Sequence, residues 1–189
     1  MAKKKKESEQ QAAKKPEITV LFTQDSVLSE NSPAARELYN QSRYGDLKED
    51  GRVQLSVLEM IYLLEKGKIN VVDSRGREIS KENVWKKTRK LDHHLFVRYS
   101  VFKDLRERGY IVKTALKFGA DFRVYDRGVK PGEDHAKWVV FPVHETATHT
   151  WYEFSAKNRV AHSTRKRLLI GIVDDEGDVT YYEARWLKP

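Results

Sequence analysis

The side chains that could carry out acid-base or nucleophilic chemistry here are those of histidine, tyrosine, lysine, serine and the carboxylates, because the chain has no cysteine. The histidines do not have the spacing of an HExxH helix or of another zinc-ligand set. The sequence also has no glycine-rich phosphate loop and no G-x-S-x-G motif. We therefore expect no metal site and no cofactor. The histidines are His93, His94, His135, His144, His149 and His162.

Two segments place polar and basic side chains at the ends of predicted strands. In residues 109–145 a strand is expected to end at Tyr125, and a loop with two glycines and a proline then leads to His135. Residues 160–167 join a predicted helix to a predicted strand and contain three consecutive basic residues. Loops held between regular elements often position reactive groups. Both segments are therefore candidates for a functional site.

A third candidate is an acidic segment around Gly177, which we expect to be the turn of a β-hairpin. Counted from its first aspartate, its sixth residue is Val179, whereas an EF-hand calcium loop needs glycine there. The segment is thus either a solvated hairpin tip or a contact with another protein. Its acidic residues are Asp174, Asp175, Glu176 and Asp178.

In the first half of the chain, local patterns predict a mixture of helices and strands. Ser32 and Pro33 indicate the start of a short helix. Ser56 and Glu59 form the pattern of a capping box, which begins a second helix that Gly67 ends. The expected elements are strands at 18–22 and 70–73 and helices at 32–42, 57–66 and 80–91.

The second half is expected to begin with a long helix over residues 94–108, with Val97, Val101 and Leu105 as its inner stripe. Segments rich in β-branched and aromatic residues indicate strands. The chain is therefore a mixed α/β (α+β) protein, with one domain at residues 16–91 and another at 92–189. The further expected elements are strands at 110–116, 122–125, 138–143, 168–173 and 179–183 and a helix at 150–162.

The net charge of +8 is unevenly distributed, because six lysines and two glutamates give residues 1–15 a net charge of +4. The other 174 residues carry the remaining +4, so charge alone argues only weakly for nucleic-acid binding. The first 15 residues are expected to be a disordered basic tail or an auxiliary phosphate-binding arm. No apolar run approaches the ~20 residues of a membrane span, and no secretory signal is seen, so we expect a cytoplasmic protein.

Several motifs, taken in order, resemble those of the archaeal tRNA-intron (tRNA-splicing) endonucleases of the short-chain, homotetrameric type. The segment KFGADFRVY ends at Tyr125 and is followed ten residues later by His135. Ser163-x-Arg165-Lys166 precedes an apolar strand, the acidic turn and Tyr181-Tyr182. The first half adds Tyr44-Gly45 and Leu55-Ser56-x-x-Glu59. The resemblance covers residues 18–187 and implies a small N-terminal domain followed by a catalytic α/β domain with a central mixed sheet.

The resemblance also implies that Tyr125, His135 and Lys166 are catalytic. In that family the RNA 2′-hydroxyl attacks the adjacent phosphorus, which leaves a 2′,3′-cyclic phosphate and a 5′-hydroxyl, without a metal. An imidazole, with a reference pKa of ~6.5, can protonate the leaving oxygen, and an ammonium can stabilise charge on the phosphoryl oxygens. A phenol, with a reference pKa of ~10, is a poor base unless a cation favours the phenolate. Tyr125 therefore either takes the 2′-proton or only orients the hydroxyl.

Further roles implied by the resemblance concern substrate and partners. The substrate is precursor tRNA with a bulge-helix-bulge element, and Arg159 and Trp186 are expected to hold a flipped base between flat surfaces. Alternatively, Trp186 only packs against neighbouring residues near the C-terminus and does not contact RNA. In a homotetramer the acidic turn would enter a basic cleft of a neighbouring subunit, and the last strand would pair with its copy.

Two other functions remain open on the sequence. The first is a catalytically silent subunit or RNA-binding module of the same fold, against which the presence of Tyr125, His135 and Lys166 argues. The second is a metal-dependent DNA nuclease that uses the acidic turn.

Overall fold

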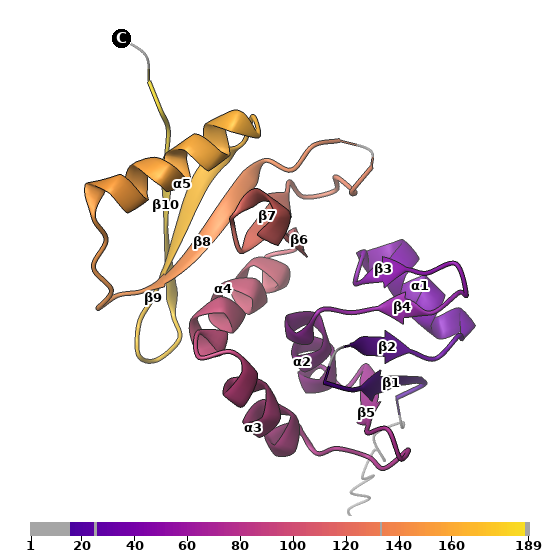
Figure 1. The fold of residues 1–189 in the computed structure, drawn as a ribbon. Helices are drawn as coiled ribbons and strands as arrows, with labels where there is room; N and C mark the ends of the chain where they lie inside the picture. The colour runs from indigo at the N-terminus through magenta and orange to yellow at the C-terminus, as the bar shows by residue number, and fades with distance from the viewer. Residues whose placement is uncertain (1–15, 25, 133, 188–189) are drawn as a thin grey trace, which may run out of the picture.

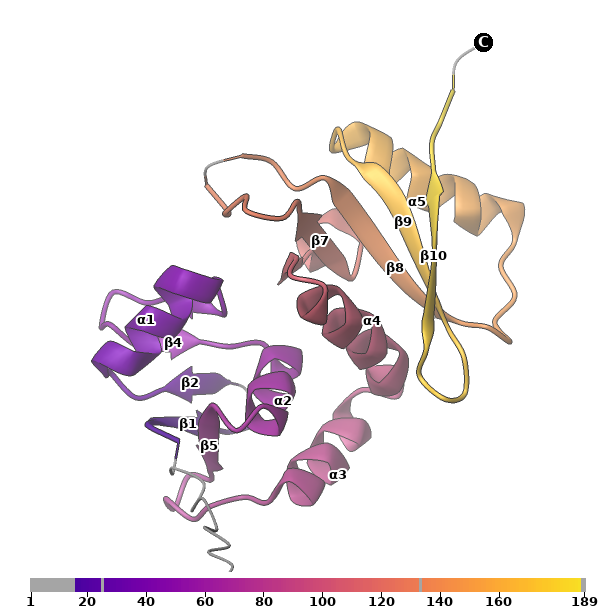
Figure 2. The same cartoon turned by 180° about the vertical axis from the view of Figure 1, so that it is seen from behind.

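The computed structural model describes residues 16–24, 26–132 and 134–187, so the predicted basic tail at 1–15 lies outside the described residues. The chain forms two five-stranded sheets, one from each half, with helices packed against them (Figures 1 and 2). Each sheet contains one parallel strand pair among antiparallel ones, so both are mixed. The predicted fold class, α+β with a mixed sheet in the second half, is confirmed.

The first sheet has the strand order β3-β4-β2-β1-β5, and only β1 and β5 pair in parallel. The helices predicted in this half are present. Three strands were not predicted, because two or three residues are too few to show an alternating pattern. The elements are β1 (Ile18–Phe22), β2 (Val27–Ser29), α1 (Pro33–Ser42), β3 (Asp46–Leu47), β4 (Val53–Gln54), α2 (Val57–Glu65), β5 (Ile69–Val72) and α3 (Lys81–Leu91).

The caps read from the sequence are present in the structure. The Ser32 side chain accepts a hydrogen bond from the Ala35 amide at 3.2 Å. Ser56 and Glu59 form both hydrogen bonds of the predicted capping box at the start of α2. The prediction for α2 was too narrow in one respect. Val57, Ile61 and Leu64 recur at helical spacing and predict one inner stripe, yet residues 58–63 are all buried, since α2 packs against β5, α3 and α4.

The second sheet has the order β10-β9-β8-β7-β6, with β8 and β9 parallel. Helix α4 packs against β6, β8, β9 and β10, and α5 packs against β9 on the other side of the sheet (Figure 1). The elements are α4 (Leu95–Glu107), β6 (Ile111–Thr114), the 3₁₀ turn η1 (Leu116–Phe118), β7 (Phe122–Tyr125), β8 (Trp138–His144), α5 (Trp151–Ser163), β9 (Arg167–Val173) and β10 (Val179–Ala184).

Two predictions in this half need correction. The strand expected over residues 110–116 ends at Thr114, because the chain turns into η1. The inner surface of α4 is wider than the stripe predicted, since Leu95, Tyr99 and Phe102 are also buried while Val97 is only partly so. Helix α4 lies between the two halves and therefore has more than one covered side.

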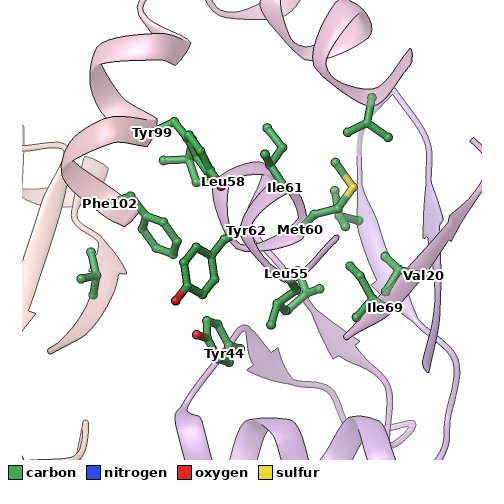
Figure 3. Close-up of a cluster of buried hydrophobic side chains, with 14 of the residues drawn as sticks. Val20, Tyr44, Leu55, Leu58, Met60, Ile61, Tyr62, Ile69, Tyr99 and Phe102 are labelled. Atoms are coloured by element: carbon green, nitrogen blue, oxygen red, sulfur yellow. The ribbon is translucent and has the colours of Figure 1, made fainter. Parts of the chain in front are cut away.

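One cluster of buried apolar side chains runs through both halves of the molecule. Its aromatic part joins α2 to α4, where the rings of Tyr62 and Phe102 meet edge to face at 5.9 Å between centroids (Figure 3). The predicted domain boundary at residues 91–92 falls between α3 and α4 and stays a prediction. Within the described part of the chain, no helix is both long and apolar enough to cross a membrane.

Candidate active site

The strand order of the second sheet brings three separate segments to one end of it. Parallel strands start at the same end, so Trp138 of β8 lies beside Arg167 of β9. Strand β7 is antiparallel to β8, with Val124 opposite Trp138, so β7 ends where β8 begins. Three segments therefore meet at this end of the sheet: the last residue of β7, the loop before β8 and the turn before β9. These are the segments that contain Tyr125, His135 and Lys166.

A cavity of about 380 Å³ lies at this meeting point. Tyr125 is 5% exposed, His135 is exposed on its loop and Lys166 is half-buried. The three residues predicted to be catalytic thus border one cavity although they are up to 41 positions apart in sequence. Its lining consists of Arg123, Tyr125, Gly132, Asp134, His135, Ala136 and Lys166.

Lys166 is positioned by the end of α5. The amide of Lys166 donates to the Ala161 carbonyl at 2.8 Å and that of Arg165 donates to the His162 carbonyl at 3.0 Å, which is the hydrogen-bond pattern of a Schellman motif. Arg165 occupies the left-handed position of this motif, with φ 55°. The Lys166 ammonium donates to the Thr164 carbonyl at 2.8 Å. Burial, followed by the positive charge of Arg123, lowers the pKa of Lys166 below the ordinary lysine value.

His135 lies on the loop between β7 and β8, and the base of this loop is held closed. Asp126 and Lys137 form an ion pair at 2.7 Å, and the Lys137 amide donates to the Val124 carbonyl at 2.8 Å. The hydrogen bond from Lys137 lowers the pKa of Asp126 below its usual value. The His135 amide donates to the Asp134 carboxylate at 2.6 Å. The imidazole is therefore placed at the cavity by backbone contacts and stays open to solvent.

Arg123 was not predicted from the sequence, although it borders the same cavity. The signal was available, because Arg123 precedes Tyr125 by two residues and alternate residues of a strand share a face. Asp134, which contributes a carboxylate to the lining, was not predicted either.

Arg159 and Trp186 lie together at a second cavity, of about 520 Å³, between α5 and the chain after β10. The Trp186 ring is 59% exposed and contacts the His162 ring at 4.5 Å between centroids. The side chain is thus both packed on one side and open on the other. The cavity is lined by Phe154, Ser155, Asn158, Arg159, His162, Ala184, Arg185, Trp186 and Leu187.

The acidic turn joins β9 to β10 at the end of the sheet remote from Lys166. Strand β9 has seven residues, so its two ends are roughly 20 Å apart at ~3.3 Å per residue. The Asp174 carboxylate accepts from the Asp178 amide at 2.8 Å, and Asp175 pairs with His144 at 3.2 Å. Glu176 is exposed. In this chain the turn therefore does not reach the catalytic cavity.

The described residues contain no group of three or more His, Asp or Glu side chains arranged to hold a metal ion. The chemical groups that the described residues bring to the first cavity are a phenol, an imidazole, an ammonium, a guanidinium and a carboxylate. Such a set suits an anionic substrate and proton transfer near neutral pH.

Comparison with known proteins gives matches over both halves of the chain. The family model of the tRNA intron endonuclease catalytic C-terminal domain matches residues 95–181, and that of the N-terminal domain matches residues 18–85. A tRNA-splicing endonuclease of Thermococcus onnurineus (strain NA1) is 41% identical over 174 residues, which cover 92% of this chain and 99% of that protein.

Two further relatives, also tRNA-splicing endonucleases, show similar agreement. The protein of Nanoarchaeum equitans (strain Kin4-M) is 47% identical over 142 residues, or 72% of this chain and 90% of its own length. That of Methanothermobacter thermautotrophicus (strain Delta H) is 43% identical over 155 residues, or 82% of this chain and 89% of its own. The motifs, both halves of the fold and these matches agree, and the chain belongs to the tRNA intron endonuclease family.

Proposed function

We propose that this protein cuts precursor tRNA at bulge-helix-bulge elements by an attack of the RNA on itself. The observation that carries the proposal is the common cavity of Tyr125, His135 and Lys166. Its relatives are named tRNA-splicing endonucleases, which supports an RNA substrate.

The reaction is a transesterification at phosphorus. The 2′-oxygen forms a bond to the adjacent phosphorus while the bond to the 5′-oxygen breaks, so the products are a 2′,3′-cyclic phosphate and a 5′-hydroxyl. His135, as imidazolium, gives its proton to the departing 5′-oxygen. Lys166 stabilises the negative charge on the phosphoryl oxygens. Tyr125 either accepts the proton of the 2′-hydroxyl or orients that hydroxyl for attack.

The substrate contacts extend beyond this cavity. Arg159 and Trp186 border the second cavity, where an exposed indole and a guanidinium offer flat surfaces for an unpaired base. Replacement of Trp186 by alanine should weaken binding of bulge-containing RNA by about 1–3 kcal/mol, the usual worth of one stacked base. Equal binding by Trp186→Ala and the unchanged protein would leave Trp186 with packing against His162 as its only role.

The protein is proposed to act as a homotetramer. Strand β10 pairs only with β9 among the described residues, so its outer edge can pair with another copy. The acidic turn is remote from the cavity of its own chain and is therefore free to contact a neighbour. Reversing the charge of Glu176 and Asp178 to lysine should shift the native mass toward smaller species, more strongly at low salt, where the charges are least screened. An unchanged mass would remove this role from the turn.

Cleavage of a bulge-helix-bulge RNA tests the reaction itself. The protein is incubated in excess EDTA with an all-ribose RNA and with an RNA that has one 2′-deoxyribose at the cleavage site. We expect cutting of the first RNA alone, with a cyclic phosphate at the new end. His135→Ala should slow cleavage by ~10²–10⁴-fold, which is the rate enhancement that a general acid usually provides. His149→Ala is the matched control, since His149 is exposed and outside the cavity lining.

Each arm of this test can contradict a separate part of the proposal. Cutting at the deoxyribose would exclude attack by the 2′-oxygen. Loss of cutting in EDTA would favour the metal-dependent alternative, and full activity of His135→Ala would remove the proposed acid. Binding without cutting would favour the RNA-binding module.

A further inference from the structure

We propose that Arg123 is a further catalytic residue, whose guanidinium binds the non-bridging oxygens of the phosphate that is cut. The inference rests on the proposed function, because it assigns a second cation to the same cavity.

Arg123 reaches the cavity because of its place in β7. It stands two residues before Tyr125 in the same strand, so both side chains leave the same face of the sheet. The Arg123 guanidinium carbon lies 5.9 Å from the centre of the Tyr125 ring. Arg123 and Lys166 both border the cavity, one from the strand and the other from the turn after α5. A phosphate in the cavity would therefore meet a cation on each of two sides.

The charge of Arg123 is not balanced within the described structure. Its side chain is half-buried, its Nε atom is fully covered and has no hydrogen-bond partner, and no ion pair with a described carboxylate is formed. Two other arginines of the second half do have carboxylate partners: Arg108 pairs with Asp104 at 2.7 Å and Arg185 pairs with Glu183 at 2.6 Å. A partly covered guanidinium without an anion leaves a positive charge unbalanced, and an anion bound beside it would balance that charge.

The cavity has room for the required anion. Its volume of about 380 Å³ corresponds to about a dozen water molecules at ~30 Å³ each, which is enough for a phosphodiester group. Among the described residues, two cations and one carboxylate border it, so this part of the lining favours a ligand with negative charge. The positive charge of Arg123 also contributes to the lowered pKa of Lys166, which indicates that the two cations share the site.

The two cations have different tasks in this arrangement. A guanidinium is a planar fork with parallel N–H groups, and it can contact two oxygens of one phosphate at once. During the attack of the 2′-oxygen the phosphorus carries five bonds, and negative charge on its non-bridging oxygens rises. Arg123 holds these oxygens in a fixed orientation, while the Lys166 ammonium acts as a point charge. The proton transfers remain with His135 and the group that receives the 2′-proton.

The test compares Arg123→Gln and Arg123→Lys with the unchanged protein in single-turnover cleavage of a bulge-helix-bulge RNA. Arg123→Gln should slow cleavage by ~10²–10³, as for the loss of one donor to transition-state charge. Arg123→Lys should recover part of this loss, because it restores the charge and not the fork. Arg127→Gln is the matched control, since it removes the same charge four residues later and Arg127 does not border the cavity.

A phosphorothioate at the cleavage site separates contact from a structural role. Sulfur in place of the non-bridging oxygen that Arg123 contacts should slow the unchanged protein, and this thio effect should shrink in Arg123→Gln. A rate for Arg123→Gln equal to that of Arg127→Gln would overturn the inference. So would a slower rate with the full thio effect retained, since Arg123 would then only support the fold. An inactive unchanged protein, or a fully active His135→Ala, would instead contradict the proposed function.

Discussion

The surroundings of Lys166 disfavour the charged form of its side chain. It is half-buried, its ammonium donates to the Thr164 carbonyl, and Arg123 borders the same cavity. Both burial and the neighbouring cation disfavour the charged form, which accounts for the direction of its pKa. Lys166 is thus held at the edge of the cavity and loses its proton more readily than a surface lysine.

This lowered pKa predicts the high-pH side of the activity profile. If the ammonium is required, the cleavage rate should fall as pH rises through a pKa below the ordinary lysine value of 10.5. Arg123→Gln removes a like charge, so the fall should move to higher pH in that variant. Lys166→Arg should lack the fall altogether, because a guanidinium stays protonated. Single-turnover rates between about pH 6 and 10.5 are measured for the unchanged protein and both variants. An identical fall in Lys166→Arg would show that the fall does not come from the Lys166 ammonium.

At the scale of elements, the end of α5 sets the direction in which the chain enters β9. The Schellman motif places Lys166 directly after a left-handed residue, a position that glycine usually fills. Here it is Arg165, with φ 55°. An L-amino acid in this conformation costs ~1–2 kcal/mol. The turn that presents Lys166 is therefore strained, and the hydrogen bonds at the end of α5 hold it.

Relief of this strain should be measurable as a gain in stability. Arg165→Gly should raise the free energy of unfolding by about 1 kcal/mol, which corresponds to a Tm higher by ~2–4 °C for a chain of this size. Thr164→Gly is the control, since Thr164 has φ −91° and its hydroxyl donates to the Val160 carbonyl at 2.8 Å. That variant should lose stability. Calorimetry gives the Tm of both variants and of the unchanged protein. A lower Tm for Arg165→Gly would show that contacts of the arginine side chain stabilise the fold by more than the strain destabilises it.

At the scale of the whole molecule, Glu59 links the two halves. Its carboxylate accepts from the Gly45 amide at 2.9 Å and from the Ser56 amide at 2.8 Å, and it lies 3.8 Å from the Lys113 ammonium of β6. Lys113 also donates to the Gly45 carbonyl. Gly45 has φ 65°, and a Cβ there would lie 2.5 Å from the Gln54 carbonyl oxygen. A glycine, a buried carboxylate and a lysine thus fix the first half against the edge of the second sheet.

Removal of this link should destabilise the fold as a whole. Glu59→Ala removes the buried carboxylate beside the Lys113 ammonium and the acceptor of the Gly45 amide, which should cost about 3 kcal/mol or more. The control is Glu153→Ala in α5, where Thr150 and Glu153 form a capping box of the same geometry on the exposed surface. That variant should change Tm far less. Thermal unfolding gives the Tm of both variants. An equal loss of Tm in Glu59→Ala and Glu153→Ala would show that Glu59 acts only as a helix cap.

The elements were largely predictable because their signals are local. Helix caps at Ser32 and Ser56 and the strands with clear β-branched runs were predicted from neighbouring residues and are confirmed. The short strands β2, β3 and β4 were missed, because their pairing with distant segments and not their own composition makes them strands. The wide burial of α2 and α4 was missed for a related reason, since each helix packs against elements of both halves.

The sequence by itself determined which side chains are available, because residue types and spacings are fixed along the chain. The absence of cysteine, the ordered motifs and the ten-residue step from Tyr125 to His135 needed no structure. Only the tertiary structure decided that Tyr125, His135 and Lys166 share a cavity, and that Arg123 joins them while the acidic turn lies at the opposite end of the sheet. The reason is physical: the parallel pairing of β8 with β9 and the antiparallel pairing of β7 with β8 are contacts between distant segments, and no local pattern specifies them.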